Sequence, residues 1–210
     1  MSYFSWRFRT IFHVMGRKAT EPQLKEGQVY RTRDLGNWSK NPSRLAKRLV
    51  GDGRLRELSH GLYECPRKSR FGLLPPSREE DMRAFLKSNA FVFTGPEVWN
   101  SLGLGSTALH ASPLVYNTKR TGEFRLGNRT YRLRRVNFPR NPSKEWFVVD
   151  LLQNHQEAGV ALEELAEGLQ RALASGRFDA RALLRQAQRF GTRKTQGVVQ
   201  EAVQSAPTKN

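Results

Sequence analysis

Cysteine, acidic residues and long apolar runs are all scarce in this chain of 210 residues. Because Cys65 is the single cysteine, an intramolecular disulfide and a zinc site built from several thiolates are excluded. No stretch approaches the ~18 consecutive apolar residues that a membrane-spanning helix needs. Arg7 and Arg9 interrupt the apolar positions near the N-terminus, so these residues lack the continuous apolar core of a signal peptide. We therefore expect a cytoplasmic protein that does not cross a membrane.

Positive charge dominates, with 36 Lys and Arg against 19 Asp and Glu and a net charge of +17. Residues 1–70 contain 16 basic and 6 acidic residues, residues 71–150 contain 12 and 7, and residues 151–210 contain 8 and 6. A protein that binds nucleic acid concentrates its positive charge on the surface that meets phosphate. The first third of the chain is therefore the expected nucleic-acid-binding segment. A membrane-surface helix is the weaker explanation, because it needs a strong apolar face without a partner domain.

Residues 32–51 predict two short helices. Thr32 is the expected N-cap of a first helical turn, and Asn41 and Pro42 are the expected N-cap and first residue of a second helix that ends at Gly51. At ~100° per residue, the apolar side chains of the second helix fall on one side. They are Leu45, Ala46, Leu49 and Val50. The opposite side carries the residues that we predict to contact DNA, which are Ser43, Arg44, Lys47 and Arg48.

A β-hairpin is predicted directly after the second helix. Residues 54–58 and 62–65 are short apolar-bearing runs that flank the loop Ser59-His60-Gly61, and residues 29–31 are a strand that could pair with them. Helix, turn, helix and hairpin follow one another as in a winged helix-turn-helix, whose second helix enters the major groove of DNA. The hairpin residues that we predict to contact DNA are Arg54, Arg56, Ser59 and His60. A basic helix face can be merely solvated, but here it coincides with a basic hairpin within ~35 residues, which favours nucleic acid.

The predicted fold class is α+β, with an N-terminal winged helix-turn-helix domain over residues 1–65 and a mixed α/β domain with C-terminal helices over residues 78–205. Between them, residues 66–77 contain three prolines and a glycine and predict an extended, exposed linker. The apolar spacing of residues 2–15 predicts a further helix, which either belongs to the winged unit or meets the second domain.

The apolar run at 91–94 predicts a buried strand, and three more strands are predicted between 114 and 136. The last two alternate apolar with basic residues and are joined by a tight turn at Gly127-Asn128. Residues 146–149 fit either a strand or the start of a helix, and three helices follow before residue 205. Asp179 is the expected N-cap of the second of these helices, and Gly191 its end. The polar side of the strands carries a basic face of Arg125, Arg132 and Arg134.

Patterns that would carry catalysis or bind a metal are not found in the sequence. The four histidines lack ligand spacing, the carboxylates are scattered, and no Gly-x-Ser-x-Gly occurs. We therefore predict a non-enzymatic protein with no catalytic residue, no metal site and no cofactor. The alternative is a nucleic-acid-processing enzyme, or another regulator, that uses the winged helix for targeting.

Two passages resemble the AbiEi family of antitoxins, the DNA-binding halves of type IV toxin–antitoxin operons. Residues 44–63 are similar to that family's recognition helix and wing, and FTGPEVWNSLGL at residues 93–104 is similar to the strand, turn and helix that open its antitoxin domain. The likeness spans roughly residues 28–200. It implies a winged helix that binds operator repeats in double-stranded DNA and represses its own operon. It also implies an antitoxin domain that counters a nucleotidyltransferase-like toxin without forming a tight complex.

Overall fold

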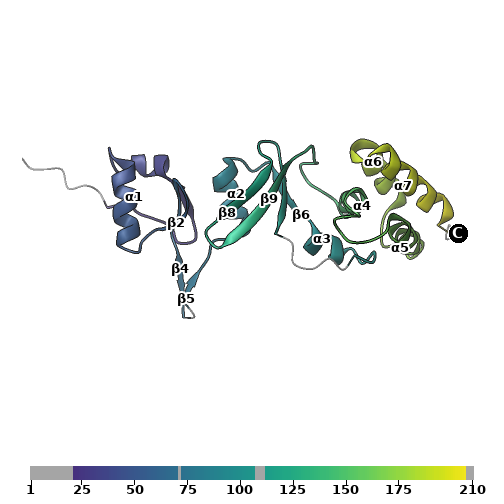
Figure 1. Ribbon diagram of the computed structural model, residues 1–210, viewed down its shortest axis with the longest axis horizontal. Helices are drawn as coiled ribbons and strands as arrows, with labels where there is room; N and C mark the ends of the chain where they lie inside the picture. The colour runs from purple at the N-terminus through teal and green to yellow at the C-terminus, as the bar shows by residue number, and fades with distance from the viewer. Residues whose placement is uncertain (1–20, 71, 107–111, 207–210) are drawn as a thin grey trace, which may run out of the picture.

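The computed structural model describes residues 21–70, 72–106 and 112–206 of the chain. In this part helices and strands are mixed, which confirms the α+β prediction. The elements are strung along an elongated molecule, with the first helix at one end and the last three helices at the other (Figure 1). The helix predicted over residues 2–15 lies outside the described residues.

The N-terminal unit consists of a small sheet with two helical segments. Its elements are β1 (Val29–Arg31), the 3-10 helix η1 (Thr32–Asn37), α1 (Pro42–Gly51), β2 (Arg56–Ser59) and β3 (Leu62–Glu64). The sheet is antiparallel in the order β1-β3-β2, so the strand predicted at residues 29–31 does pair with the hairpin.

Local capping signals set the start of α1. The side chain of Asn41 accepts a hydrogen bond from the backbone N–H of Arg44 at 3.0 Å, and Pro42 is the first helical residue, as predicted. The prediction for Thr32 is wrong, because Arg31 occupies the N-cap position of η1 and its backbone N–H donates to the carboxylate of Asp34 at 2.8 Å. The backbone N–H of Thr32 is already used, since it donates to the carbonyl of Gly61 in the hairpin turn at 3.0 Å.

The hairpin turn is one residue shorter than predicted. Ser59 is the last residue of β2 and pairs with Leu62, so the loop contains only His60 and Gly61. Gly61 has a φ of +73°, a backbone conformation that glycine adopts at little cost.

The segment predicted as an extended linker folds instead as a two-stranded hairpin. β4 (Arg67–Ser69) pairs antiparallel with β5 (Gly72–Leu74), and together they project from the body of the molecule (Figure 1). Its prolines flank the hairpin rather than interrupt it, so they remove no hydrogen bond from the strand pair.

The main sheet has four strands in the order β6-β7-β9-β8. They are β6 (Phe91–Thr94), β7 (Leu114–Asn117), β8 (Gly122–Leu126) and β9 (Arg129–Arg135), and β7 and β9 run parallel while the other neighbours are antiparallel. The tight turn predicted at Gly127-Asn128 joins β8 to β9. The strand pattern is thus confirmed, but the parallel pair in the middle of the sheet is not visible in the sequence.

Six helices accompany this sheet in the described residues. They are α2 (Arg78–Leu86), α3 (Pro96–Ser101), α4 (Lys144–Gln153), α5 (Leu162–Ala174), α6 (Ala180–Phe190) and α7 (Arg193–Ser205). Residues 146–149, for which the sequence leaves two possibilities, lie inside α4. Asp179 caps α6 as predicted, because its side chain accepts a hydrogen bond from the N–H of Ala182 at 2.6 Å.

Two cores lie on opposite faces of the main sheet. On one face, the apolar side chains of β8 and β9 share a core with Met82 of α2 and with Leu58 and Leu62 of the N-terminal sheet. On the other face, β7 packs against α4 and the C-terminal helices around Trp146. The N-terminal sheet therefore contributes to the core of the second half, and Arg31 adds hydrogen bonds to backbone carbonyls of α2 at 2.7 and 2.8 Å. The domain limits expected from the sequence stay a prediction, but the boundary that they place at residues 66–77 crosses a shared core.

Candidate nucleic-acid interface

Helix α1 has a buried side and a cationic side. Leu45, Ala46 and Leu49 are buried against β1 and η1, whereas Val50, predicted to lie with them, is 36% exposed because it sits at the edge of the apolar side. The cationic side carries the exposed residues Ser43, Arg44, Lys47 and Arg48. Within the described residues, none of these three basic side chains forms an ion pair. Their charge is therefore available to an external anion.

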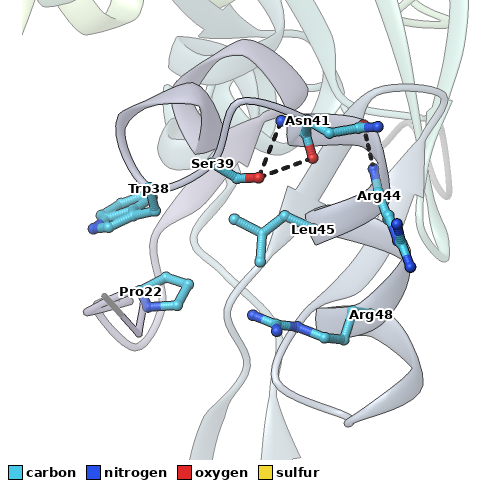
Figure 2. A pocket seen from close by; sticks show the side chains of 7 residues that line it. All are labelled: Pro22, Trp38, Ser39, Asn41, Arg44, Leu45 and Arg48. Carbon is cyan, nitrogen blue, oxygen red and sulfur yellow. Dashed lines mark hydrogen bonds between the residues drawn. The ribbon is translucent and has the colours of Figure 1, made fainter. Parts of the chain in front are cut away.

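A pocket of about 450 Å³ opens beside this cationic side (Figure 2). It is lined by Pro22, Trp38, Ser39, Asn41, Arg44, Leu45 and Arg48. Figure 2 shows Arg48 extending beneath Leu45 toward Pro22, while Arg44 points away on the other side. Trp38, Pro22 and Leu45 supply the apolar part of its lining, and Arg44 and Arg48 supply the charged part. Such a recess suits a flat or apolar group that is attached to a phosphate.

The two arginines predicted to make the wing basic are engaged within the protein. Arg54 donates to a carboxylate oxygen of Glu21 at 2.8 Å and to the carbonyl of Pro22 at 2.7 Å. Arg56 lies directly opposite Glu64 in the β2–β3 pair and forms an ion pair with it. Their charges are therefore offset, and the role that we predicted for them in DNA binding stays a prediction.

The remaining hairpin residues differ in exposure. Ser59 is half-buried at the end of β2, and His60 is exposed in the turn. The turn itself is the part of the hairpin best placed to approach a nucleic acid backbone.

Glu64 is a buried carboxylate with a partly exposed partner. Its side chain is 0% exposed, whereas that of Arg56 is 48% exposed. Burial raises the pKa of Glu64, and the guanidinium of Arg56 acts in the opposite direction. This pair ties β2 and β3 together across the sheet.

The predicted basic face on β8 and β9 is less basic than the sequence suggests. Arg125, Arg132 and Arg134 do share one side of the strands, but Arg132 and Arg134 both form ion pairs with Glu157. Arg125 donates to the carbonyl of Gly127 at 3.2 Å. Two of the three arginines thus share the single negative charge of a carboxylate that follows α4, too distant in the sequence for a pattern to reveal.

Two aspartates are buried although no sequence pattern indicated it. Asp150 on α4 is 2% exposed and accepts hydrogen bonds from the hydroxyl of Thr94, from the indole of Trp99 at 2.8 Å and from the amide of Asn154 at 3.0 Å. Burial raises the pKa of Asp150, while the hydrogen bonds from Thr94 and Trp99 act to lower it. The aspartate therefore joins β6, α3 and α4.

Asp81 of α2 joins that helix to β9. Its carboxylate accepts from the hydroxyl of Tyr131 at 2.7 Å and from the guanidinium of Arg129 at 3.3 Å. Burial is also the main reason that the pKa of Asp81 is raised. The only signal in the sequence was an acid in a first helical turn, which is as typical of an exposed helix end.

The described ranges contain neither a candidate metal site nor a candidate membrane-spanning helix. No group of three or more His, Cys, Asp or Glu side chains in them is placed to hold a metal ion. None of their helices has the length and apolar character to cross a membrane.

The fold and this surface define a basic α+β protein with an unpaired cationic helix face. No protein-family model matches the chain, and no curated protein matches it either.

Proposed function

We propose that this protein is a DNA-binding transcriptional repressor in which α1 enters the major groove. The observation that carries the proposal is the cationic side of α1, where Arg44, Lys47 and Arg48 are exposed opposite the buried side chains of Leu45, Ala46 and Leu49. None of the three has to give up an ion pair with another described residue in order to reach a phosphate or a guanine. Binding therefore costs little reorganisation of the protein.

The arrangement around α1 supports a winged helix. Strand, helical turn, helix and hairpin follow one another as β1, η1, α1, β2 and β3, and β1 closes the sheet beside β3. In a winged helix, a hairpin that follows the second helix in this order serves as a wing along the DNA backbone, and we assign that role to the β2–β3 turn. Arg54 and Arg56 are then engaged by Glu21 and Glu64, and the turn residues Ser59 and His60 make the contact.

The resemblance to AbiEi antitoxins supports a finer proposal. The protein would repress its own operon through operator repeats and counter a nucleotidyltransferase-like toxin encoded with it. The measurement is growth of cells that express the toxin of the same operon, with and without this protein. Growth arrest that this protein does not relieve would contradict the antitoxin role while leaving DNA binding intact.

DNA binding is tested by fluorescence anisotropy with a duplex from the region upstream of the protein's own gene and a scrambled duplex. If the interface covers ~6–10 phosphates, affinity should fall ~10³–10⁵-fold between 50 and 200 mM salt. Arg44→Ala should cost ~1–3 kcal/mol on the operator and relax the preference at one base position, because Arg is the commonest bidentate partner of guanine.

A matched control is available on α5. Arg171 is 72% exposed and faces Glu167 at 3.7 Å, so Arg171→Ala removes the same charge from a different surface. We expect this variant to bind both duplexes as the unaltered protein does. A flat salt response, or equal losses in Arg44→Ala and Arg171→Ala, would contradict the proposed interface.

A further inference from the structure

A second row of unpaired cations lies on α6, at the end of the molecule opposite α1 (Figure 1). Arg181, Arg185 and Arg189 follow one another at intervals of four residues, and α7 opens with Arg193 and Lys194. All five are exposed, and none of them forms an ion pair with another residue that the structure describes. The guanidinium of Arg189 lies 5.3 Å from the centre of the Phe190 ring. We call these five residues the α6 row.

The α6 row opposes the electrostatics of its own helices. Like charges four residues apart repel on a helix surface, and cations in a first turn are disfavoured by the helix dipole. Arg181 is in the first turn of α6, where the only acid is Asp179 at the N-cap, and Arg193 and Lys194 are in the first turn of α7, which contains no acid. Arg189 is the exception, because it lies in the last turn of α6, where the helix dipole favours a cation. An ordinary solvated face intersperses both signs of charge. This face is instead suited to an external polyanion, which would relieve the repulsion.

The α6 row leads into a pocket of about 400 Å³. Arg189 and Phe190 form part of its lining, together with the rings of Tyr116 and Trp146 and with polar side chains. The polar lining residues are Arg134, Asn137, Asp150, Gln153 and Asn154. A pocket of this size, in which aromatic rings lie beside polar and charged side chains, is sufficient for a nucleoside.

Two amides of the pocket have hydrogen-bonding capacity to spare. Asn137 is exposed and its side chain has no hydrogen bond to another described residue. Gln153 uses its carbonyl oxygen to accept from the N–H of Thr192 at 3.1 Å, which leaves its NH₂ group as a donor. The side chain of Asn154, by contrast, is engaged by Arg134 and Asp150. Asn137 and Gln153 are therefore the groups that can read the edge of a ligand.

We propose that the α6 row and this pocket bind a single-stranded polynucleotide. Arginines four residues apart on a helix are ~6 Å apart along its axis, and their planar forks suit successive phosphates of one strand. The unpaired base nearest Arg189 enters the pocket, lies against Phe190 and bonds to Asn137 and Gln153. A cationic track that ends at an aromatic ring is the usual design for single strands. This site goes beyond the repressor proposal, because it uses none of the residues of α1.

The α6 row is tested with the full chain and labelled probes of ~12 nucleotides, a length in the range of single-strand sites. Single-stranded RNA, single-stranded DNA of the same sequence and the corresponding duplex are compared. Arg185→Gln should lower the slope of log affinity against log salt by ~0.7 for single strands, whereas Arg171→Gln on α5 should leave it unchanged. The tighter of the two single strands identifies the sugar. Equal slopes in the two variants would overturn the proposal.

The pocket is tested separately from the α6 row. Phe190→Leu and Asn137→Ala should each weaken single-strand binding, Phe190→Leu by about tenfold through lost stacking, with an unchanged salt slope. Because Phe190 also packs against the core, melting curves must show that this variant folds, and the exposed Asn137 provides a variant without that risk. Single-strand binding that ignores both substitutions would overturn the proposal. So would a duplex that binds as tightly as the single strands to protein in which Arg44→Gln and Arg48→Gln have removed the α1 interface.

The two proposals fail independently. Protein that carries Arg44→Gln and Arg48→Gln should lose duplex binding and keep its single-strand affinity. Loss of single-strand binding in that protein would place the strand on α1 and overturn the α6 site.

Discussion

Replacing Arg56 by alanine should destabilise the protein at neutral pH, whatever it does to DNA binding. The substitution leaves the carboxylate of Glu64, which is 0% exposed, without its cationic partner. Burial already raises the pKa of Glu64, and loss of the guanidinium removes the influence that holds the pKa down. The structure therefore predicts a lower free energy of unfolding, caused by the unpaired carboxylate between β2 and β3.

The magnitude follows from the exposure of the two partners. A hydrogen bond to a charged group contributes ~1.5–3 kcal/mol, and the half-exposed position of Arg56 reduces this through solvent screening. Protonation of the buried carboxyl group limits the loss further. We expect the free energy of unfolding to fall by about 1–2 kcal/mol at pH ~7.5. For a chain of this size that lowers Tm by ~2–8 °C.

The loss of stability in Arg56→Ala should increase with pH. A carboxyl group with a raised folded pKa binds its proton more tightly in the folded state, so its contribution to stability decreases as pH rises from the unfolded value through the folded value. Since Arg56→Ala raises the folded pKa of Glu64 further, its deficit should be small near pH ~4, below both values, and grow as pH increases. Thermal unfolding followed by circular dichroism across this range measures it.

Two controls make the result decisive. Arg83→Ala removes an arginine of similar exposure that pairs with the more accessible Glu80, and it should cost ~0.5 kcal/mol or less. In a Glu64→Gln background, Arg56→Ala should lose most of its effect, because no buried charge remains. Equal losses for Arg56→Ala and Arg83→Ala, or a deficit independent of pH, would refute the reasoning.

Three further substitutions test a helix cap, a buried hydrogen bond and a tight turn, each by equilibrium unfolding. Asn41→Ala removes the N-cap of α1 and should cost ~1 kcal/mol; no change would mean that the cap is dispensable. Tyr131→Phe removes the hydroxyl that donates to the buried Asp81, and it should cost ~1–3 kcal/mol at neutral pH and less in acid, where the carboxyl group is protonated. Gly127→Ala places a Cβ 3.1 Å from Leu58 at a φ of +60° and should cost ~1 kcal/mol or more, unless the turn relaxes.

The sequence alone determined the features that depend on near neighbours. Asn41 and Pro42 start α1, Asp179 starts α6, and the turn at residues 127–128 joins two strands, because capping and turn geometry involve residues only a few positions apart. The two-sided character of α1 follows from helical periodicity in the same way, and so does its cationic face.

Only the tertiary structure decided which charges remain free. Arg132 and Arg134 meet Glu157, and Arg54 meets Glu21, and these partners are 23 to 33 positions away along the chain. The α6 row, by contrast, meets no acid among the described residues. Ion pairing depends on strand register and on how helices pack, which periodicity within one element does not specify. The shared core between the N-terminal sheet and α2 was decided in the same way, by contacts between distant parts of the chain. The hairpin of residues 67–74 pairs near neighbours, but its flanking prolines favoured an extended linker in the sequence.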